Sequence, residues 1–117
     1  MREIIFRGKR KDNGKWVYGD LYHDRSRLYT KPDIKIANYM GKLPVIPETV
    51  GQYIGLKDKS GRRIFEGDIL SLQTRRPYVV RFEDGTFSLE NTAIPVRFAN
   101  KFDVIGNIHD NPELLEK

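Results

Sequence analysis

The chain has 117 residues, of which 38% are hydrophobic and 32% charged, and a chain of this length normally forms one domain. It contains no Cys, which excludes disulfides, thiolate metal sites and a cysteine nucleophile and favours a cytoplasmic protein. No apolar run approaches the roughly 18 residues that a membrane helix needs, and the first residues lack a secretory pattern. We therefore expect neither membrane spanning nor export.

The positive charge is concentrated near the N-terminus. The chain has 21 Lys and Arg against 16 Asp and Glu, a net charge of +5. Residues 1–31 hold nine of these basic residues and four of the acidic ones. Two interpretations of this block stay open, because such blocks are common on solvated hairpin surfaces and also occur in patches that face nucleic acid.

Period-two hydrophobic alternation, interrupted by turn residues, predicts antiparallel strands along most of the chain. The first two strands are predicted over Glu3–Lys9 and Lys15–Tyr22. Asn13 and Gly14 lie between them, and an Asn-Gly pair favours the positive φ values of a tight hairpin turn. The sequence therefore predicts a first hairpin with these two residues as structural turn residues.

The middle of the chain predicts a loop followed by a second hairpin. Pro and Gly interrupt Arg25–Pro47, which favours an irregular excursion. Beyond it, the extended segments Thr49–Leu56 and Arg62–Glu66 flank the polar turn K-D-K-S-G.

A further turn follows directly. Gly67 and Asp68 are predicted to turn the chain into a strand over Ile69–Gln73. A strand pair, a Gly-Asp turn and a new hydrophobic strand are typical of small SH3-like barrels, where the chain passes from one sheet to the other.

A third hairpin is predicted over Pro77–Phe82 and Thr86–Leu89, with Asp84 and Gly85 in the turn. Its residues alternate, with Tyr78, Val80 and Phe82 on one face and Val79 and Arg81 on the other.

Two short strands, over Ile94–Phe98 and Val104–Ile108, are predicted to precede a terminal helical turn. Asn111 is suited to cap this turn and Pro112 to begin it. The predicted fold is mainly β, as a small SH3-like barrel or a set of antiparallel hairpins with a short C-terminal helical turn, in a single domain over residues 1–117.

Catalytic chemistry finds little support in the residues. His23 and His109 have no second His at ligand spacing, and the serines lie outside any nucleophile elbow. Four acids fall within a short stretch and are interpreted as turn and architectural residues: Glu48, Asp58, Glu66 and Asp68. We expect no enzyme activity, no catalytic or metal-binding residues, no cofactor and no small-molecule substrate.

Basic residues interleaved with aromatic ones could supply phosphate contacts and stacking surfaces for nucleic acid. The candidate residues are Lys9, Arg10, Lys11, Arg62, Arg63, Arg75 and Arg76. The neighbouring aromatic residues are Phe65, Tyr78, Phe82 and Phe98. The alternation argues against this interpretation: if Tyr78, Val80 and Phe82 face inward as one row, Phe82 belongs to the core and fewer rings are exposed for bases.

Several runs along the chain resemble the YopX protein family, which bacteriophages and prophages encode. The longest is P-E-T-V-G-Q-Y-I-G-L-K-D-K-S-G-R-R-I-F-E-G-D-I-L at Pro47–Leu70. The other runs are Ile4–Gly8, Trp16–Leu21, Val80–Leu89 and Val104–Leu115. The resemblance spans nearly the whole chain and leaves only Arg25–Val45 and Leu72–Pro77 without a matching pattern.

The resemblance implies a small cytoplasmic protein that is made in a phage-infected or lysogenic bacterium and associates with itself. It brings no catalytic residues with it. The leading hypothesis is therefore a non-enzymatic accessory protein whose sheet edges or exposed apolar residues bind a second copy, or a phage or host protein. A nucleic-acid-binding accessory protein is the alternative.

Overall fold

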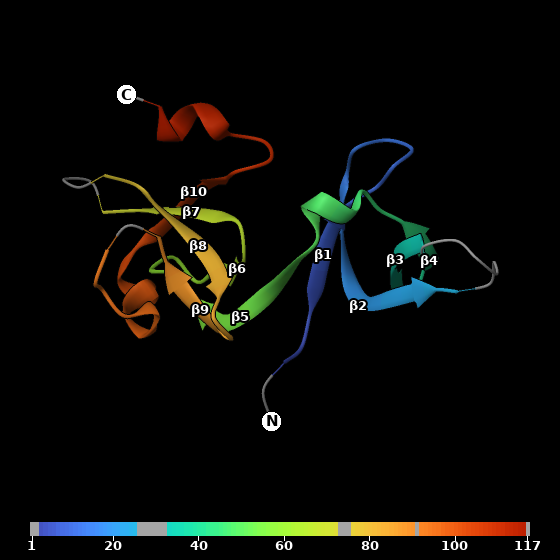
Figure 1. The fold of residues 1–117 in the computed structure, drawn as a ribbon, viewed down its shortest axis with the longest axis horizontal. Helices are drawn as coiled ribbons and strands as arrows, with labels where there is room; N and C mark the ends of the chain where they lie inside the picture. Colours follow the sequence, from blue (N-terminus) through green and yellow to red (C-terminus); the bar gives the residue numbers. More distant parts are fainter. Residues whose placement is uncertain (1–2, 26–32, 73–75, 91, 117) are drawn as a thin grey trace. The chain divides into compact units, whose positions relative to one another are not determined.

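The computed structural model describes residues 3–25, 33–72, 76–90 and 92–116 (Figure 1). These residues form a mainly β chain with two antiparallel sheets and three short 3-10 helices. The strands are β1 (Phe6–Lys9), β2 (Trp16–Asp24), β3 (Asp33–Asn38), β4 (Gly41–Pro44), β5 (Gly51–Lys57), β6 (Arg63–Phe65), β7 (Asp68–Ser71), β8 (Tyr78–Glu83), β9 (Thr86–Leu89) and β10 (Asp103–Asn107). The helices are η1 (Pro47–Thr49), η2 (Val96–Lys101) and η3 (Pro112–Leu115). The strands of the described ranges close no barrel, so the SH3-like barrel stays a prediction.

The chain divides into two compact units, Met1–Gln52 and Tyr53–Lys117. Strand β5 contributes to both, because Gly51 and Gln52 pair with β1 whereas its later residues pair with β6. The expectation of a single domain over residues 1–117 stays a prediction.

The turn of the first hairpin is stabilised by one backbone hydrogen bond and by the side chain of Asn13. Gly14 has a φ of 71°, a left-handed value that favours glycine, and its N–H donates to the carbonyl of Arg10. Asn13 Oδ1 accepts the N–H of Lys15 at 2.9 Å. The turn therefore joins β1 and β2 with its polar groups satisfied.

Strand β2 changes partners halfway along its length. Its residues up to Gly19 pair with β1, and those from Asp20 onward pair with β3, and the ribbon bends between the two halves (Figure 1). A Cβ atom at Gly19 would lie 2.3 Å from the carbonyl oxygen of Ala37. The close approach of β3 at this bend therefore requires glycine.

The core of the first unit lies on one side of β2. Ile36 and Val45 are fully buried. Leu21 pairs with Ile36, and Val17 pairs with Gly8, where a Cβ atom would lie 3.0 Å from Val45 Cβ. The alternation alone did not decide which face of β2 is buried, and the structure places Val17 and Leu21 on the core side.

An irregular excursion was expected over Arg25–Pro47. This is wrong for the described part of the segment, which contains the antiparallel strands β3 and β4. Residues 26–32 lie outside the described ranges. Asn38 Oδ1 accepts the N–H of Met40 at 2.8 Å, and Gly41 has a φ of 116°, so a two-residue loop joins the strands. β4 is an edge strand, where its terminal proline is tolerated.

The second edge of β1 is partly covered by η1. The expectation that a strand begins at Thr49 is wrong, because Thr49 ends η1 and β5 begins at Gly51. Thr49 Oγ1 accepts the N–H of Lys9 at 2.9 Å and donates to the carbonyl of Ile46 at 2.6 Å. A hydroxyl thus replaces the ladder partner that β1 lacks at this position.

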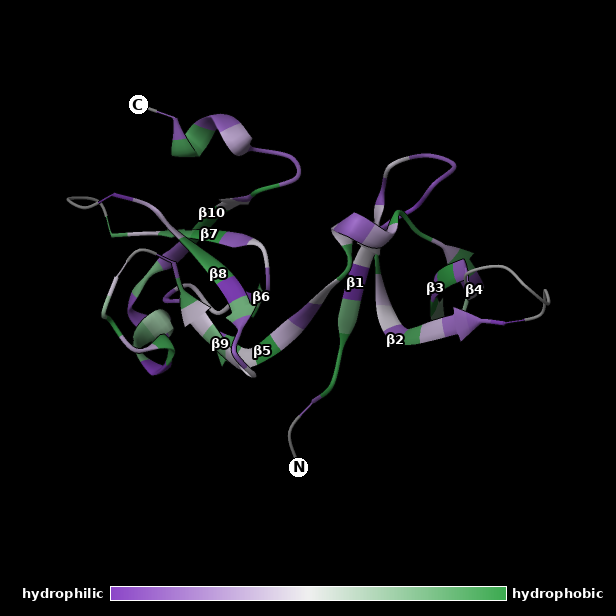
Figure 2. Ribbon diagram, in the orientation of Figure 1, coloured by the Kyte–Doolittle hydropathy of each residue, from purple (hydrophilic) through white to green (hydrophobic). Residues whose placement is uncertain are grey.

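The core of the second unit lies around β7, which stands between β10 and β8, with β9 beyond β8. Figure 2 shows hydrophobic stretches along β7 and β8. The buried cluster consists of Ile64, Leu70, Val80, Leu89, Ala99 and Phe102. Residues Asp68–Leu70 are all buried, so β7 is covered on both faces.

The Glu-Gly-Asp turn between β6 and β7 connects three parts of the second unit. Gly67 has a φ of 92°, donates its N–H to the carbonyl of Val80 and accepts the N–H of Ile108. The buried Asp68 carboxylate accepts the N–H of Phe65 at 2.7 Å. Gly67 makes its two bonds in a left-handed conformation, which favours glycine over other residues.

The β8–β9 hairpin turns at Asp84 and Gly85, whose φ values of 52° and 79° are those of a tight two-residue loop. An inward-facing row of Tyr78, Val80 and Phe82 would have placed Phe82 in the core, but its side chain is 51% exposed. Phe82 pairs with Phe87 next to the turn, where their ring centroids are 5.0 Å apart. The two rings therefore cover each other beyond the end of the core.

The predicted strand over Ile94–Phe98 is also wrong, because these residues lead into η2. Pro95 lacks the N–H that a strand ladder needs, and its carbonyl accepts the N–H of Phe98. Ala99 and Phe102 then bury their side chains in the core. Packing therefore favours a 3-10 helix where the alternation predicts a strand.

The terminal helical turn is present as η3, but Asn111 does not cap it with its side chain. Its Oδ1 instead accepts the N–H of Asn107 at 3.2 Å, which connects the turn to the end of β10. Of the described residues, none belongs to a helix long and apolar enough to span a membrane.

Gly67→Val is expected to lower the free energy of unfolding by about 1–3 kcal/mol, because a β-branched side chain is strained at this positive φ. Urea denaturation measures the loss. The exposed residue Thr86 provides a control, since Thr86→Val should change the value by less than about 0.5 kcal/mol. An unchanged midpoint for Gly67→Val would contradict the role of this turn.

Candidate nucleic-acid interface

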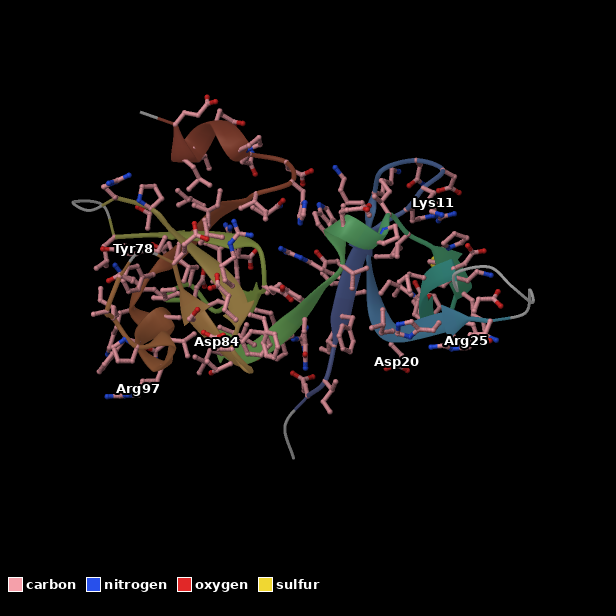
Figure 3. All side chains as sticks on the ribbon, in the orientation of Figure 1. Lys11, Asp20, Arg25, Tyr78, Asp84 and Arg97 are labelled. Atoms are coloured by element: carbon pink, nitrogen blue, oxygen red, sulfur yellow. The ribbon has the colours of Figure 1, made fainter. Side chains whose placement is uncertain are left out.

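The first predicted basic group lies on the β1–β2 hairpin. Lys9 Nζ is 5.9 Å from the ring centroid of Trp16. Arg10 donates from Nε and Nη2 to the two carboxylate oxygens of Asp12, at 2.9 and 2.7 Å. Lys11 is exposed at the turn (Figure 3). A local carboxylate therefore neutralises much of the charge of Arg10, and Lys11 keeps its charge in solvent.

The second predicted group lies at the start of β6, in the other unit. Arg62 donates from Nη1 to the carbonyl of Val104 at 3.2 Å. The guanidinium of Arg63 lies 5.7 Å from the ring centroid of Tyr53. Both arginines are exposed, so each contact leaves charge at the surface.

The remaining two predicted residues precede β8. Arg76 is exposed, and Arg75 lies outside the described residues. The structure therefore brings neighbouring residues together within each unit, and the predicted basic residues are divided between the two units.

The turn beside Arg62 is organised by one buried carboxylate. Asp58 is 5% exposed. Its Oδ1 accepts the N–H groups of Ser60 and Arg62, at 2.9 and 2.8 Å, and its Oδ2 accepts the N–H of Val104 at 3.0 Å. Asp58 also donates its own N–H to the carbonyl of Arg62 at 2.7 Å. One side chain therefore closes the β5–β6 turn and attaches it to β10.

Burial and hydrogen bonding act on the pKa of Asp58 in opposite directions. Burial alone raises this pKa, because it disfavours the charged carboxylate. The three N–H donors, from Val104, Arg62 and Ser60, together with the charge of Arg62, outweigh burial and hold the pKa of Asp58 below its ordinary value. The carboxylate is therefore ionised at neutral pH, and its negative charge strengthens the hydrogen bonds that it accepts from the three backbone N–H groups.

Three exposed lysines that were not among the predicted candidates lie around the same turn. Lys57 pairs directly with Arg63 across the two strands. Lys59 donates its N–H to the carbonyl of Phe102 at 2.9 Å, which places it beside Lys101 at the end of η2. The K-D-K-S-G turn signalled the first two lysines, but Lys101 joins them only through a contact distant in sequence.

Two of the aromatic residues expected near the arginines are withdrawn from solvent. Phe65 is buried, and Tyr78 packs edge-on against Phe102. Phe98 on η2 is 41% exposed, and the guanidinium of Arg97 lies 4.8 Å from its ring centroid. Of the four expected aromatic residues, Phe82 and Phe98 are therefore exposed, and Phe98 is the one that lies on η2 beside Arg97.

On the outer face of β2, β3 and β4, two lysines contact side chains of the same face. Lys35 Nζ donates to Asp24 at 2.7 Å, and this hydrogen bond is the main cause of the raised pKa of Lys35. Lys42 Nζ lies 4.1 Å from the ring centroid of Tyr22. These contacts stabilise the face and leave it a weaker candidate for a ligand.

Titratable residues do not gather into a metal site in the described part of the chain, where no group of three or more His, Asp or Glu could hold an ion. His23 is exposed on β2. Asp58 and Asp68, two of the four clustered acids, accept backbone N–H groups, as architectural residues do.

The family model described as YopX protein matches residues 5–116. The chain belongs to the YopX family. This agrees with the resemblance seen in its sequence, and the match includes the β3–β4 hairpin that the quoted runs did not cover. No curated protein matches the chain.

One solved structure shows that this YopX chain shares its fold with another protein. The crystal structure of protein EF1440 from Enterococcus faecalis is 24% identical in sequence, with a TM-score of 0.65. The similarity covers 99% of this chain and 100% of that one. At this level of identity the likeness concerns the fold alone.

Asp58→Asn is expected to lower the free energy of unfolding by about 1–3 kcal/mol. The amide oxygen can replace Oδ1, but the NH₂ group then faces the buried N–H of Val104 and leaves that donor unsatisfied. Asp103→Asn is the matched control, because its contact with the Ser60 hydroxyl is exposed and an amide can still accept it. Urea denaturation should show the loss of stability in Asp58→Asn and little change in Asp103→Asn.

The stability of the wild-type protein should also depend on the charge of Asp58. A pKa lowered by folding adds stability above the unfolded pKa, near 4, that is lost as the pH falls through the folded value. The free energy of unfolding of the wild type should therefore fall more steeply than that of Asp58→Asn below about pH 4. Parallel pH profiles for the two proteins would contradict this assignment.

Proposed function

We propose that the protein acts by binding a second copy of itself, without a catalytic step. The observation that carries this proposal is the tip of the β3–β4 hairpin, formed by Tyr39 and Met40. Tyr39 is 97% exposed and Met40 is 59% exposed. Apolar side chains gathered at one exposed point are a common mark of an interaction surface.

The hairpin tip is held in place before any partner binds. Asn38 accepts the N–H of Met40 with its Oδ1 and donates from Nδ2 to the carbonyl of Tyr18 at 3.0 Å. A tip fixed in this way loses little conformational freedom on association, which favours binding.

The composition of the tip favours a second copy as the partner. A methionine sulfur packs well against an aromatic ring, in a contact of about 0.3–1.5 kcal/mol. Because the tip carries both members of such a pair, a twofold axis can place Tyr39 of each copy against Met40 of the other. The surface is therefore self-complementary.

The small size of the tip predicts a weak dimer. Two side chains per copy bury much less than the roughly 1,200 Å² of a standard interface. Association is therefore expected in a concentration-dependent equilibrium, which suits an accessory protein that exchanges partners.

The proposed setting is the cytoplasm of a bacterium that carries a phage or prophage, where the protein serves as an accessory factor. Membership of the YopX family supports this setting. A phage or host protein that offers a complementary apolar surface could use the same tip.

Sedimentation velocity over a concentration series tests the proposal. The wild type should show a mass above the 13.7 kDa of one chain as the concentration rises. The double variant Tyr39→Ser, Met40→Ser should remain monomeric, because it removes both halves of the contact. The control Leu115→Ser changes an exposed apolar residue of the second unit and should associate as the wild type does. A wild type that stays at the mass of one chain, or a double variant that still associates, would refute the proposal.

A further inference from the structure

Five exposed cations surround the β5–β6 turn in the second unit. This basic turn surface consists of Lys57, Lys59, Arg62, Arg63 and Lys101. Three contacts hold its parts together: the pairing of Lys57 with Arg63, the bond from Lys59 to Phe102, and the bond from Arg62 to Val104. Residues that are distant in sequence thus form one positively charged surface.

The nearby acids neutralise this surface only in part. Asp58 lies at its centre, but its carboxylate is buried and accepts three backbone N–H groups. Asp103 is half-buried and accepts the hydroxyl of Ser60 at 2.9 Å. The carboxylates of Asp58 and Asp103 are thus engaged in hydrogen bonds of the turn, and the five cations beside them are exposed to solvent.

The clustering does not follow from the charge of the unit as a whole. Residues 53–117 contain ten basic and ten acidic residues. Glu83 and Asp84 lie at the β8–β9 turn, and Glu113 lies in η3. The unit has no net charge, so an excess of basic residues does not explain the five cations at the turn. Such a local cluster of cations creates a field that attracts a polyanion.

An exposed aromatic ring lies next to the basic turn surface. Phe98 and Lys101 are three residues apart on η2, and side chains at this spacing lie in one row along a 3-10 helix. The exposed guanidinium of Arg97 lies over the ring of Phe98, and Figure 3 shows Arg97 on the outside of the second unit. A stacking surface and phosphate-binding cations are therefore adjacent.

We infer that the basic turn surface, with Phe98, binds single-stranded nucleic acid. Lysines and arginines contact the phosphate backbone, and the aromatic ring stacks with an unpaired base. Single strands are favoured over duplex because Phe98 can stack only with a base that is free of its own pairing partner. The Asp58 hydrogen bonds hold the turn in shape before the ligand arrives, so binding need not order it.

This inference is independent of the proposed self-association, because the hairpin tip and the basic turn surface belong to different units. It also changes the sequence-based hypothesis. The surface contains Arg62 and Arg63 from the predicted residues together with Lys57, Lys59 and Lys101, and exposed lysines of the β1–β2 hairpin provide the control.

Fluorescence anisotropy with a labelled oligo(dT) of about 20 nucleotides, over a salt series, tests the inference. The site variant is Lys59→Gln, Lys101→Gln, whose side chains are exposed. The matched control is Lys11→Gln, Lys15→Gln, which removes the same charge from exposed positions in the first unit. The site variant should bind more weakly, and its slope of log affinity against log salt should be smaller by about 1.4, or about 0.7 per lost phosphate contact. The control should keep the slope of the wild type.

A third variant distinguishes base stacking from simple attraction to phosphate. Phe98→Ala should weaken oligo(dT) binding about fivefold or more and leave the salt slope unchanged. The same variant should bind heparin, a polyanion without bases, as the wild type does.

Four results would overturn the inference. They are an absence of oligo(dT) binding at low salt, equal losses in the site variant and the control, a loss in the control alone, and an unaltered affinity in Phe98→Ala. The Tyr39→Ser, Met40→Ser variant should bind oligo(dT) normally, so a failure of self-association is recognised separately.

Discussion

The second unit depends on one carboxylate that satisfies three backbone N–H groups. Asp58 connects its own turn with Val104, 46 positions away, and so determines where β10 lies against the β5–β6 turn. The cost of burying a charge is offset by charge-assisted hydrogen bonds, which are about twice as strong as neutral ones. Because a hydrophobic residue cannot accept these bonds, the position demands an acid. The surrounding cations then take their places from backbone geometry that this acid controls.

Local patterns predicted the features of the chain that local chemistry determines. Asn13-Gly14 and Asp84-Gly85 specify tight turns through the φ values that these residues tolerate, and the structure shows such values at Gly14, Asp84 and Gly85. Most of the antiparallel strands followed from alternation, whereas β3 and β4 lie where an irregular excursion was expected. Family membership followed from runs of sequence that match directly and need no knowledge of packing.

Features decided by distant contacts were not predictable in this way. The strand expected over Ile94–Phe98 became η2 because Ala99 and Phe102 enter a core formed by β7, β8 and β9. Lys101 joins Lys59 only once η2 lies against the turn. Phe82 follows the buried parity of its strand, yet it lies beyond the end of the core. Alternation indicates which face a side chain occupies, and it does not indicate where the core stops.

The hairpin tip and the basic turn surface are built in a similar way. Each lies at a turn, and in each a short polar side chain satisfies backbone groups: Asn38 behind the hairpin tip, and Asp58 behind the basic turn surface. Because these bonds use the side chains of Asn38 and Asp58, the outward side chains of each turn can vary without loss of the turn. Binding specificity can therefore change while the fold is kept.

The long-range bonds also set an order in which the chain can fold as the ribosome makes it. The contacts that complete the first unit are present once Gln52 has emerged, since Thr49 then bonds to Lys9 and β5 begins to pair with β1. The Asp58 carboxylate, in contrast, has to wait for Val104 before its third donor exists. Because domains generally fold from the N-terminus during synthesis, the first unit can be formed while the second is still an open chain. The nascent protein then exposes its β6 and β7 residues until the last segment arrives, and this interval is when it is most exposed to aggregation.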